Sequence, residues 1–450
     1  MKHTRIDVAE FIERRERVMA QMPNNAVALI PANKEVTRSR DTEFLFCQDK
    51  DFYYLTGFHE PDALLVLVKI DGQQESILFC RDKDPQQEVW HGRRVGAEKA
   101  EEVFKFDLTY TLDELEQVLP MYINGRDTLL FAQGAQPEFD SMVFACLDIL
   151  RNGFKQGFTA PTTIIDIRPI IHEMRLIKSA AEIEIMREAN VITGNAHTRA
   201  MKFTKHGVFE YQVEAEILHE FASNGARTAA YGSIVGGGEN ATILHYTDND
   251  EVLIDEELLL IDAGAELSGY AADITRTFPV SGKFNTHQAA LYNVVLDAQN
   301  AVIEQIKPGI TFAALNDVAC EVLTKGLYEL GILTGDLNQL IAEKACKQYF
   351  IHGLGHWLGL DVHDVGDYQM NEDKQQMRAF EPGMVLTIEP GLYIDAEANV
   401  DENYQGLGIR IEDNILVTET GHENLSVNVV KTVEDIEALM YQGSQAAQNA

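Results

Sequence analysis

The stretch ELLLIDAGAELSGYAADITRTFPV, residues 257–280, decides the fold of this chain. Its apolar residues have the character of strands, and the dipeptide Ser268-Gly269 lies between its two halves. A small polar residue followed by glycine is typical of a turn between two strands. We therefore predict a hairpin whose two strands carry Asp262 and Asp273 inside apolar surroundings.

Helical patterns precede the hairpin. Val213, Ile217 and Phe221 recur at the spacing of one helix face, which ends at Asn224-Gly225. An earlier face is formed by Ile183, Met186 and Ala189.

Helices and strands alternate again after the hairpin. Helices are expected from about 286 to 306, ending before Pro308-Gly309, and onward from an N-cap at Thr311. Strand-like runs return in PGMVLTIEPGLYI (382–394) and LGIRIEDNILVTE (407–419). This order of helices, acidic hairpin, helices and acidic strands predicts two similar α/β halves that face each other.

The part of the chain before about residue 169 predicts a separate α/β region. ALLVLVKI (63–70) and SILFC (76–80) predict neighbouring strands joined at Asp71-Gly72, and DTLLFA (127–132) predicts another strand. The segment 159–179 contains Pro161 and Pro169, and we expect an ordered connector there. The predicted domains are 1–172 and 173–440, followed by a disordered polar tail over 441–450.

Composition excludes several classes of protein. Of 450 residues, 45% are hydrophobic and 24% charged, which is ordinary for a globular chain. The 37 basic and 71 acidic residues give a net charge of −34, which repels nucleic acid and anionic lipid. No apolar run is long enough for a membrane span or a signal peptide. The five cysteines include no C-x-x-C pair, so we expect free thiols and a cytoplasmic location.

Four carboxylates interrupt the apolar runs: Asp262, Asp273, Glu389 and Glu412. A buried carboxylate costs several kcal/mol unless it is paired or binds a metal. Any one of them alone is explained as an acid capped by backbone amides at a strand end. Arg410, two residues before Glu412 on the same strand face, can neutralise one of the four but not all. Metal cations can neutralise the rest.

Histidines supply the remaining candidate ligands. The segment HGLGHWLGLDVHDVG, 352–366, contains His352, His356 and His363, and its glycines favour a loop with close backbone approach over a helix. One imidazole with four carboxylates is a hard donor set that suits Mn²⁺ or another first-row divalent ion. Four carboxylates carry enough charge for two such ions about 3.5–4 Å apart, which can share a hydroxide.

Other chemistries lack their motifs. The sequence has no G-x-S-x-G around Ser233, no phosphate-binding loop and no H-E-x-x-H. Gly236-Gly237-Gly238 is interpreted as a loop that permits close approach at the mouth of the site. His245 follows a short apolar run, and its position is consistent either with this site or with an ordinary surface histidine.

These residues resemble the aminopeptidase P, prolidase and methionine aminopeptidase superfamily, and most closely its aminopeptidase P branch. DFYYLTGFHEPDALLVL (51–67) and VWHGRRVGAEKA (89–100) resemble the N-terminal domain of that branch. VHD, TIEPGLYI and GIRIEDN resemble its catalytic domain. The resemblance implies an N-terminal α/β domain of the creatinase/prolidase type followed by a pita-bread catalytic domain. It also implies hydrolysis of the first peptide bond of peptides with proline second, by a hydroxide bridging two divalent ions, most commonly Mn²⁺.

Roles of individual residues follow from the same resemblance. The implied metal ligands are Asp262, Asp273, His356, Glu389 and Glu412, with Asp273 and Glu412 as the bridging pair. Glu389 would also move a proton, and His245, His352 and His363 would line the substrate site. Tyr393 and Arg410 would lie beside the ligands or in the pocket, and Trp90 would reach a neighbouring subunit's site in a homo-oligomer, a tetramer or dimer. Lys155 stands where a close relative is expected to have arginine. The resemblance therefore does not assign to this chain the part of the pocket wall that the N-terminal domain contributes.

Two further classes share the fold. Prolidase has the same five ligands but cuts only dipeptides, and YYLTGFHEPDA (53–63) argues against it. Non-catalytic binding scaffolds and creatinase-like metal-free hydrolases of the superfamily lack the carboxylate set, which is complete here.

Overall fold

The computed structural model describes residues 5–370 and 376–448 and divides the chain into two compact units. One unit is Ile6–Arg175, and the other contains the chain from Leu176 onward together with Arg5. The sequence-based boundary between residues 172 and 173 stays a prediction. Each unit is described by itself below.

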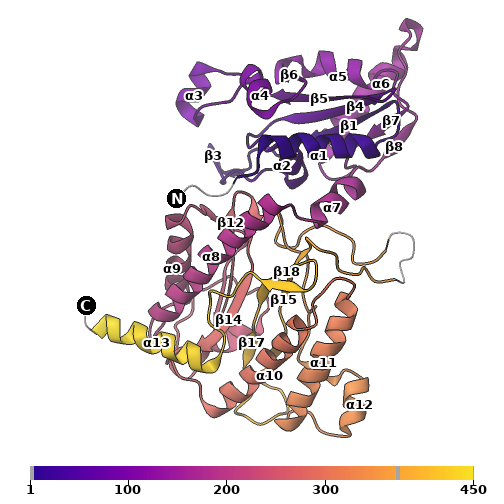
Figure 1. Cartoon of the computed structure of the whole chain (residues 1–450). Coiled ribbons are helices and arrows are strands. Elements are labelled where there is room, and N and C mark those ends of the chain that lie inside the picture. The colour runs from indigo at the N-terminus through magenta and orange to yellow at the C-terminus, as the bar shows by residue number, and fades with distance from the viewer. Residues whose placement is uncertain (1–4, 371–375, 449–450) are drawn as a thin grey trace. The chain divides into compact units, whose positions relative to one another are not determined.

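The first unit is a mixed six-stranded sheet between helices (Figure 1). The strand order is β6-β5-β4-β1-β7-β8, in which β1, β4 and β5 are antiparallel neighbours and the outer pairs are parallel. Apolar side chains of α5 and α6 pack on one face of the sheet in a core that includes Val27, Val66, Phe79, Leu129 and Leu147. The elements are α1 (Val8–Gln21), β1 (Ala26–Pro31), β2 (Thr37–Ser39), β3 (Thr42–Glu43), α2 (Lys50–Thr56), β4 (Leu64–Ile70), β5 (Gln73–Cys80), α3 (Pro85–His91), α4 (Ala97–Phe104), β6 (Leu108–Thr111), α5 (Leu115–Ile123), β7 (Thr128–Leu130), α6 (Pro137–Asn152), β8 (Thr163–Ile165) and α7 (Arg168–Leu176).

The predicted hairpin at Asp71-Gly72 is confirmed. β4 and β5 pair from Leu64↔Phe79 to Ile70↔Gln73, and both turn residues have positive φ, 49° at Asp71 and 83° at Gly72. Two successive residues with positive φ are typical of the tight turn that matches the twist of a two-stranded hairpin.

The ordered connector expected over 159–179 contains the boundary between the two units and includes regular structure. Strand β8 and helix α7 occupy most of it. Pro169 is the second residue of α7, where its missing N–H would have no intrahelical partner and its fixed φ suits a helix. Pro169 therefore lies in the first turn of a helix and does not interrupt one.

The second unit consists of two similar halves. In the first half, α8 and α9 accompany the antiparallel sheet β10-β11-β14 and the small sheet β13-β12-β9. In the second half, α10 and α11 accompany the antiparallel sheet β15-β18-β19 and the pair β16-β17 (Figure 1). The elements are α8 (Ala180–Phe203), α9 (Glu210–Ser223), β9 (Thr228–Ala229), β10 (Ile234–Gly237), β11 (Leu258–Ala263), β12 (Ala265–Leu267), β13 (Tyr270–Ala271), β14 (Ile274–Pro279), α10 (Thr286–Ile303), α11 (Phe312–Glu329), α12 (Leu337–Ala342), the 3₁₀ turn η4 (Ala345–Gln348), β15 (Val385–Ile388), β16 (Gly391–Tyr393), β17 (Gly408–Arg410), β18 (Asp413–Val417), β19 (His422–Asn424) and α13 (Val433–Gln448).

The hairpin of residues 257–280 forms with a break at Gly264. Ser268 and Gly269 make the turn with φ of 50° and 88°, as predicted. A Cβ on Gly264 would lie 1.7 Å from the carbonyl oxygen of Ala272, so only glycine permits this approach. The chain bends there, which leaves Asp262 near the end of β11 and Asp273 directly before β14.

A buried cation joins the two halves. The guanidinium of Arg276 on β14 donates to the carbonyl oxygen of Glu412 at 2.7 Å and to Asp413 Oδ1 at 2.7 Å. Lys431 Nζ contacts Asp413 Oδ2 at 2.8 Å. Burial opposes the charge of Asp413, but Arg276 and Lys431 outweigh it and lower the pKa of that carboxyl to about 2. The backbone that carries Glu412 is thus fixed against the strand that follows Asp273.

Two sequence-based expectations differ from the structure in this unit. Gly236 and Gly237 belong to strand β10 and not to a loop, and a Cβ on Gly237 would lie 2.6 Å from the side chain of Leu253. Helix α13 continues to Gln448, into the predicted tail 441–450, because alanine and glutamine favour helix; residues 449–450 lie outside the described part.

No helix within residues 5–370 and 376–448 is long and apolar enough to cross a bilayer.

Replacing Asp413 by Asn should destabilise the protein by about 3 kcal/mol or more, because Arg276 would remain buried without its counter-charge. The folded pKa lies below the unfolded value of about 3.9, so this stability is present at neutral pH and is lost as the pH falls below about 4. Urea unfolding at pH values from 7 to 3 measures the free energy of unfolding of both proteins. The difference in this free energy between wild type and D413N should stay constant above about pH 5 and decrease below it.

Glu321→Gln is the control, because its ion pair with Lys325 is exposed on both sides and should change stability by less than about 1 kcal/mol. Equal effects of D413N and E321Q would contradict the role of the buried network.

Candidate metal centre

Four carboxylates meet where the two halves of the second unit face each other. Each half contributes two: Asp262 and Asp273 come from β11 and the residue before β14, and Glu389 and Glu412 follow β15 and β17. Asp262, Asp273 and Glu412 are buried and Glu389 is half-buried. The Glu412 N–H donates to the carbonyl oxygen of Thr275 at 3.1 Å, which sets Glu412 beside Asp273.

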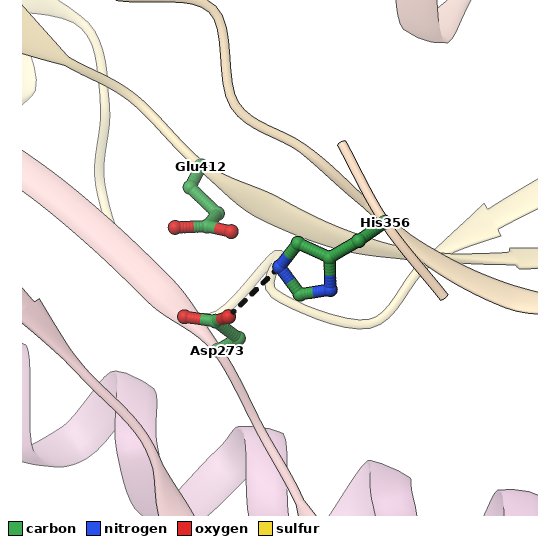
Figure 2. Close-up of side chains that lie close together, drawn as sticks. All are labelled: Asp273, His356 and Glu412. Atoms are coloured by element: carbon green, nitrogen blue, oxygen red, sulfur yellow. Dashed lines mark ion pairs between the residues drawn. The ribbon is translucent and has the colours of Figure 1, made fainter. Parts of the chain in front are cut away.

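Asp273, His356 and Glu412 form the tightest group (Figure 2). One ligand atom from each lies within 4.8 Å of the other two. The His356 ring points with Nε2 toward Asp273 Oδ2, 3.4 Å away, and Nε2 lies 3.5 Å from Glu389 Oε1. The structure therefore brings these four sequence-predicted residues together around one imidazole nitrogen.

The loop that carries His356 lies along the edge of β15. Thr387 N–H donates to the carbonyl oxygen of His356 at 2.9 Å, and Glu389 N–H donates to that of Leu354 at 2.9 Å. A Cβ on Gly355 would lie 1.9 Å from the Thr387 carbonyl oxygen, so the close approach predicted from the glycines occurs here. At Gly353 it does not, because the nearest atom to a Cβ is 4.0 Å away.

The hydrogen-bond partners of the His356 ring show that its Nε2 requires a bound cation. Nδ1 lies 2.9 Å from the carbonyl oxygen of Trp357, which can only accept, so Nδ1 carries the hydrogen. In the neutral ring the lone pair of Nε2 then points at two carboxylates, which repel it. Burial lowers the pKa of His356, but Asp273 and Glu389 outweigh burial and raise it to about 9. This position requires a cation, either a proton or a metal ion.

The carboxylates carry more negative charge than their neighbours compensate. Burial raises the pKa of Asp262, but Arg410 Nη2, 2.6 Å from Oδ2, outweighs it and lowers that pKa.

The other three carboxyls shift upward. Burial and the charge of Asp262 raise the pKa of Asp273 to about 6, and burial raises that of Glu389 to about 7. Burial and the nearby carboxylates raise the pKa of Glu412 well above its usual value. Four carboxylates against one arginine leave three uncompensated negative charges, more than one divalent ion supplies and close to what two supply. The residues fit a two-ion site.

Tyr231 is a site residue that the sequence did not reveal. Its hydroxyl lies within hydrogen-bond distance of Asp262 Oδ1 and of Asp273 Oδ1. Burial and the two carboxylates hold its pKa well above the usual value, so it stays a neutral donor. The sequence analysis searched for carboxylates within apolar runs, and an uncharged tyrosine in the loop before β10 does not meet that criterion.

Hydroxyl and amide side chains fix the orientation of the other acids. Thr275 Oγ1 donates to Glu412 Oε2 at 2.7 Å, and Thr387 Oγ1 donates to Glu389 Oε1 at 3.3 Å. Asn414 clamps the backbone of Asp273, accepting from its N–H at 2.9 Å and donating to its carbonyl oxygen. Such partners hold ligands in place and raise metal affinity.

A chain of polar contacts leads from the acids to His352. The Tyr393 hydroxyl accepts from Arg410 Nη1 at 2.9 Å and contacts His352 Nε2 at 2.8 Å. His352 Nδ1 lies 3.6 Å from Glu389 Oε2. Burial and the charge of Arg410 lower the pKa of His352 to about 4, so the ring is neutral. Three predicted pocket residues therefore adjoin the acid cluster.

His363 stands against the ring of His356, with ring centroids 4.3 Å apart. Desolvation by the surrounding protein and the charges of His356 and His245 lower the pKa of His363. The side chains of His363 and His245 are exposed.

The loop bearing His363 is anchored by a buried ion pair that the sequence did not suggest. Lys178 Nζ lies 2.9 Å from Asp364 Oδ2, and both side chains are 1% exposed. A Cβ on Gly359 would lie 2.1 Å from Asp364 Oδ2, so the backbone closes tightly over the pair.

Trp90 lies in the first unit, on α3, with 80% of its surface exposed. Its predicted role in a neighbouring subunit's site stays a prediction. Lys155, also in the first unit, has Nζ 6.0 Å from the ring centroid of Phe154.

Comparisons with known proteins find matches to two family models and to proteins similar over nearly the whole chain. Residues 184–419 match the model of metallopeptidase family M24, and residues 11–131 match that of the aminopeptidase P N-terminal domain. The chain is 49% identical to the Xaa-Pro aminopeptidase of Escherichia coli K12, over 96% of this chain and 97% of that protein. Zinc-substituted E. coli aminopeptidase P in complex with product superposes with a TM-score of 0.95, at 49% identity over 98% and 99% of the two chains. Proline aminopeptidase P II from Yersinia pestis also gives 0.95, at 50% identity over 97% and 100%.

Tyr231→Phe should weaken binding of Mn²⁺ by about 10-fold, because the hydroxyl orients two carboxylates of the cluster. Equilibrium dialysis of the full chain against Mn²⁺ measures this. Tyr246→Phe is the matched control: its hydroxyl donates to Glu210 Oε2 at 2.8 Å, outside the cluster, and its removal should leave the affinity unchanged. Identical Mn²⁺ affinities for the two variants would rule out the role given to Tyr231.

Proposed function

The chain belongs to metallopeptidase family M24, and we propose that it is an Xaa-Pro aminopeptidase, which removes the first residue of peptides that have proline second. The observation that carries this proposal is the cluster of four carboxylates and His356 between the two halves of the second unit. Similarity to enzymes of that name over nearly the whole length of both chains supports it.

The chemistry of the substrate agrees with such a site. An Xaa–Pro bond is a tertiary amide without an N–H, and the proline ring fixes φ. A peptidase that must bind that N–H or an extended backbone fails on this bond. A carboxylate-rich site instead attracts the protonated α-amine of the substrate and acts on the carbonyl group.

We propose that Asp262, Asp273, His356, Glu389 and Glu412 hold two divalent ions, of which Mn²⁺ suits the oxygen-rich donors best. When bound, such ions polarise the scissile carbonyl and lower the pKa of water so that hydroxide forms near neutral pH. The uncompensated charge of the cluster and the direction of His356 Nε2 support this assignment. Co²⁺, Zn²⁺ and Fe²⁺ fit the same donors, and availability decides among them.

The leaving prolyl nitrogen must receive a proton. One carboxylate oxygen of Glu389 can accept a proton from water and later donate it to the leaving nitrogen. The side chain is half-buried and burial raises its pKa, which suits both steps. His363, against the ring of His356, is the second group that can hold a proton on the substrate side. The ion pair of Lys178 with Asp364 fixes the backbone next to His363 and so limits where its ring lies.

The chain Arg410–Tyr393–His352 gives the pocket a fixed polar wall. Arg410 holds both Asp262 and Tyr393, so the carboxylate and the hydroxyl keep one relative position. His352, neutral near pH 7, has Nδ1 2.7 Å from the carbonyl oxygen of Gly353 and Nε2 2.8 Å from the Tyr393 hydroxyl, so its ring is held in one orientation beside Glu389. His245 is proposed to border the same space.

Prolidase remains the alternative with the same ligands, and the similarity over the N-terminal domain supports the aminopeptidase reading. We further propose a homo-oligomer, a tetramer or dimer, in which the exposed Trp90 reaches a neighbouring subunit. The five free cysteines support a reducing, cytoplasmic location.

A peptide panel tests the function. With Mn²⁺ present, the enzyme should release the first amino acid from Xaa-Pro-Xaa and longer peptides. It should act at least about 10-fold less well on Xaa-Ala-Xaa, because a pocket that accepts the proline ring loses apolar contacts when alanine replaces it. Amino acid release followed by chromatography gives kcat/KM for each peptide.

Asp273→Asn is the control and should release no amino acid above background. A preference for Xaa-Pro dipeptides over tripeptides would assign the protein as a prolidase. Undiminished activity of D273N, or of protein exhaustively treated with chelator, would refute the metal-dependent mechanism.

A further inference from the structure

Helix α8 carries a row of buried polar side chains outside the acid cluster. Asn190, Thr193 and His197 are each 0% exposed, and their spacings of three and four place them along one face of the helix. We call these three residues the α8 polar row. The helix packs against β12, β13 and β14, the strands around the bend at Gly264. Buried polar groups are costly unless they are hydrogen-bonded, so the partners of the row indicate its role.

Thr193 and His197 bind the backbone on either side of Gly264. Thr193 Oγ1 accepts from the N–H of Ala265 at 3.0 Å. His197 Nε2 lies 3.2 Å from the carbonyl oxygen of Ala263, which can only accept, so Nε2 carries the hydrogen. Ala263 and Ala265 are fully buried, so water does not reach these two backbone groups and the side chains of α8 satisfy them instead.

The bend that these contacts hold lies between the two acids of the first half. Asp262 directly precedes Ala263, and Asp273 directly follows Ala272, whose carbonyl oxygen lies against Gly264. A change in the bend therefore shifts Asp262 relative to Asp273.

Asn190 reaches the same region through the second half. Its Oδ1 accepts from Ser426 Oγ at 3.1 Å, and Ser426 Oγ accepts from the N–H of Asn414 at 3.0 Å. Asn414 is the residue whose side chain clamps the backbone of Asp273. The α8 polar row thus supports the backbone next to Asp262 directly and that of Asp273 through two further residues.

His197 is more polar than packing alone requires. No group in the part of the chain that the structure describes hydrogen-bonds its buried Nδ1. Burial and the charge of Arg276 lower the pKa of His197 to about 4, so the ring is neutral at pH 7 and Nδ1 carries a lone pair. A buried acceptor without a partner costs stability, and an apolar side chain of similar size would avoid that cost. What such a side chain could not supply is the N–H that Nε2 donates to Ala263.

We propose that Thr193 and His197 are positioning residues that hold the bend at Gly264, so that Asp262 and Asp273 face the same divalent ions. This inference rests on the proposed function, because the position of the acids matters in this way only if the cluster binds metal. Groups that fix metal ligands from outside commonly change metal affinity by about 10- to 100-fold.

Thr193→Val tests the contact with Ala265 at nearly constant side-chain size. Without the hydroxyl, the N–H of Ala265 has no acceptor, and the affinity for Mn²⁺ in equilibrium dialysis of the full chain should fall by about 10-fold. Thr204→Val is the matched control. Both hydroxyls donate to the carbonyl oxygen four residues earlier at 2.9 Å, but Thr204 lies at the C-terminal end of α8, away from the bend. T204V should bind Mn²⁺ as wild type does.

His197→Gln and His197→Met separate the N–H donor from the space that the ring fills. The amide of glutamine can place an N–H near the position of Nε2, so H197Q should keep its Mn²⁺ affinity within about threefold, whereas H197M should lose about 10-fold. Urea unfolding without metal measures the stability of each variant alongside. A merely structural role would lower stability without this rescue of affinity by glutamine.

Three results decide the inference. Wild-type Mn²⁺ affinity in T193V, or equal losses of affinity in H197Q and H197M, overturns it. If circular dichroism shows that H197M does not fold, the comparison of T193V with T204V decides alone. A wild-type chain that binds no Mn²⁺ refutes the proposed function, and the inference falls with it, whereas a failure confined to the variants leaves the proposed function standing.

Discussion

Repulsion among four neighbouring carboxylates is the constraint on which the second unit depends. Asp262, Asp273, Glu389 and Glu412 lie within one region shielded from water, where like charges cannot all be ionised without cations. Arg410 neutralises Asp262, and His356 is turned so that its free nitrogen faces the remaining acids. The arrangement is stable as a set of anions only around positive charge.

The architecture explains how such a set is held together. Neither half carries the site alone, because each supplies two acids from the ends of its strands. Arg276 and Asp413 fix the halves to each other close to Asp273 and Glu412, and Asn414 ties the Asp273 backbone to the opposite half. These contacts hold together a region in which the four carboxylates repel one another. The strands that carry the acids are rigid and keep them at constant separation.

The sequence predicted the parts of the site that break a local rule. An acid within an apolar strand is anomalous, so Asp262 and Glu412 could be found without any structure, and glycines flanking His356 indicated the close approach that Gly355 makes. Tyr231 and the Lys178–Asp364 pair could not be found in this way, because they are ordinary residues until the fold brings them beside distant partners. The sequence analysis did not predict helix α7 within 159–179, since proline suits the first turn of a helix as well as a connector. The bend at Gly264 depends on its contact with the opposite strand, and the sequence around Gly264 does not reveal that contact.

Anomalous X-ray diffraction from crystals grown with Mn²⁺ tests the central claim most directly. We expect two manganese peaks about 3.5–4 Å apart, bordered by the carboxylates of Asp273 and Glu412, with His356 Nε2 next to one of them. Crystals that show no manganese between these side chains, with the four carboxylates either turned apart or paired to arginine and lysine, would contradict it.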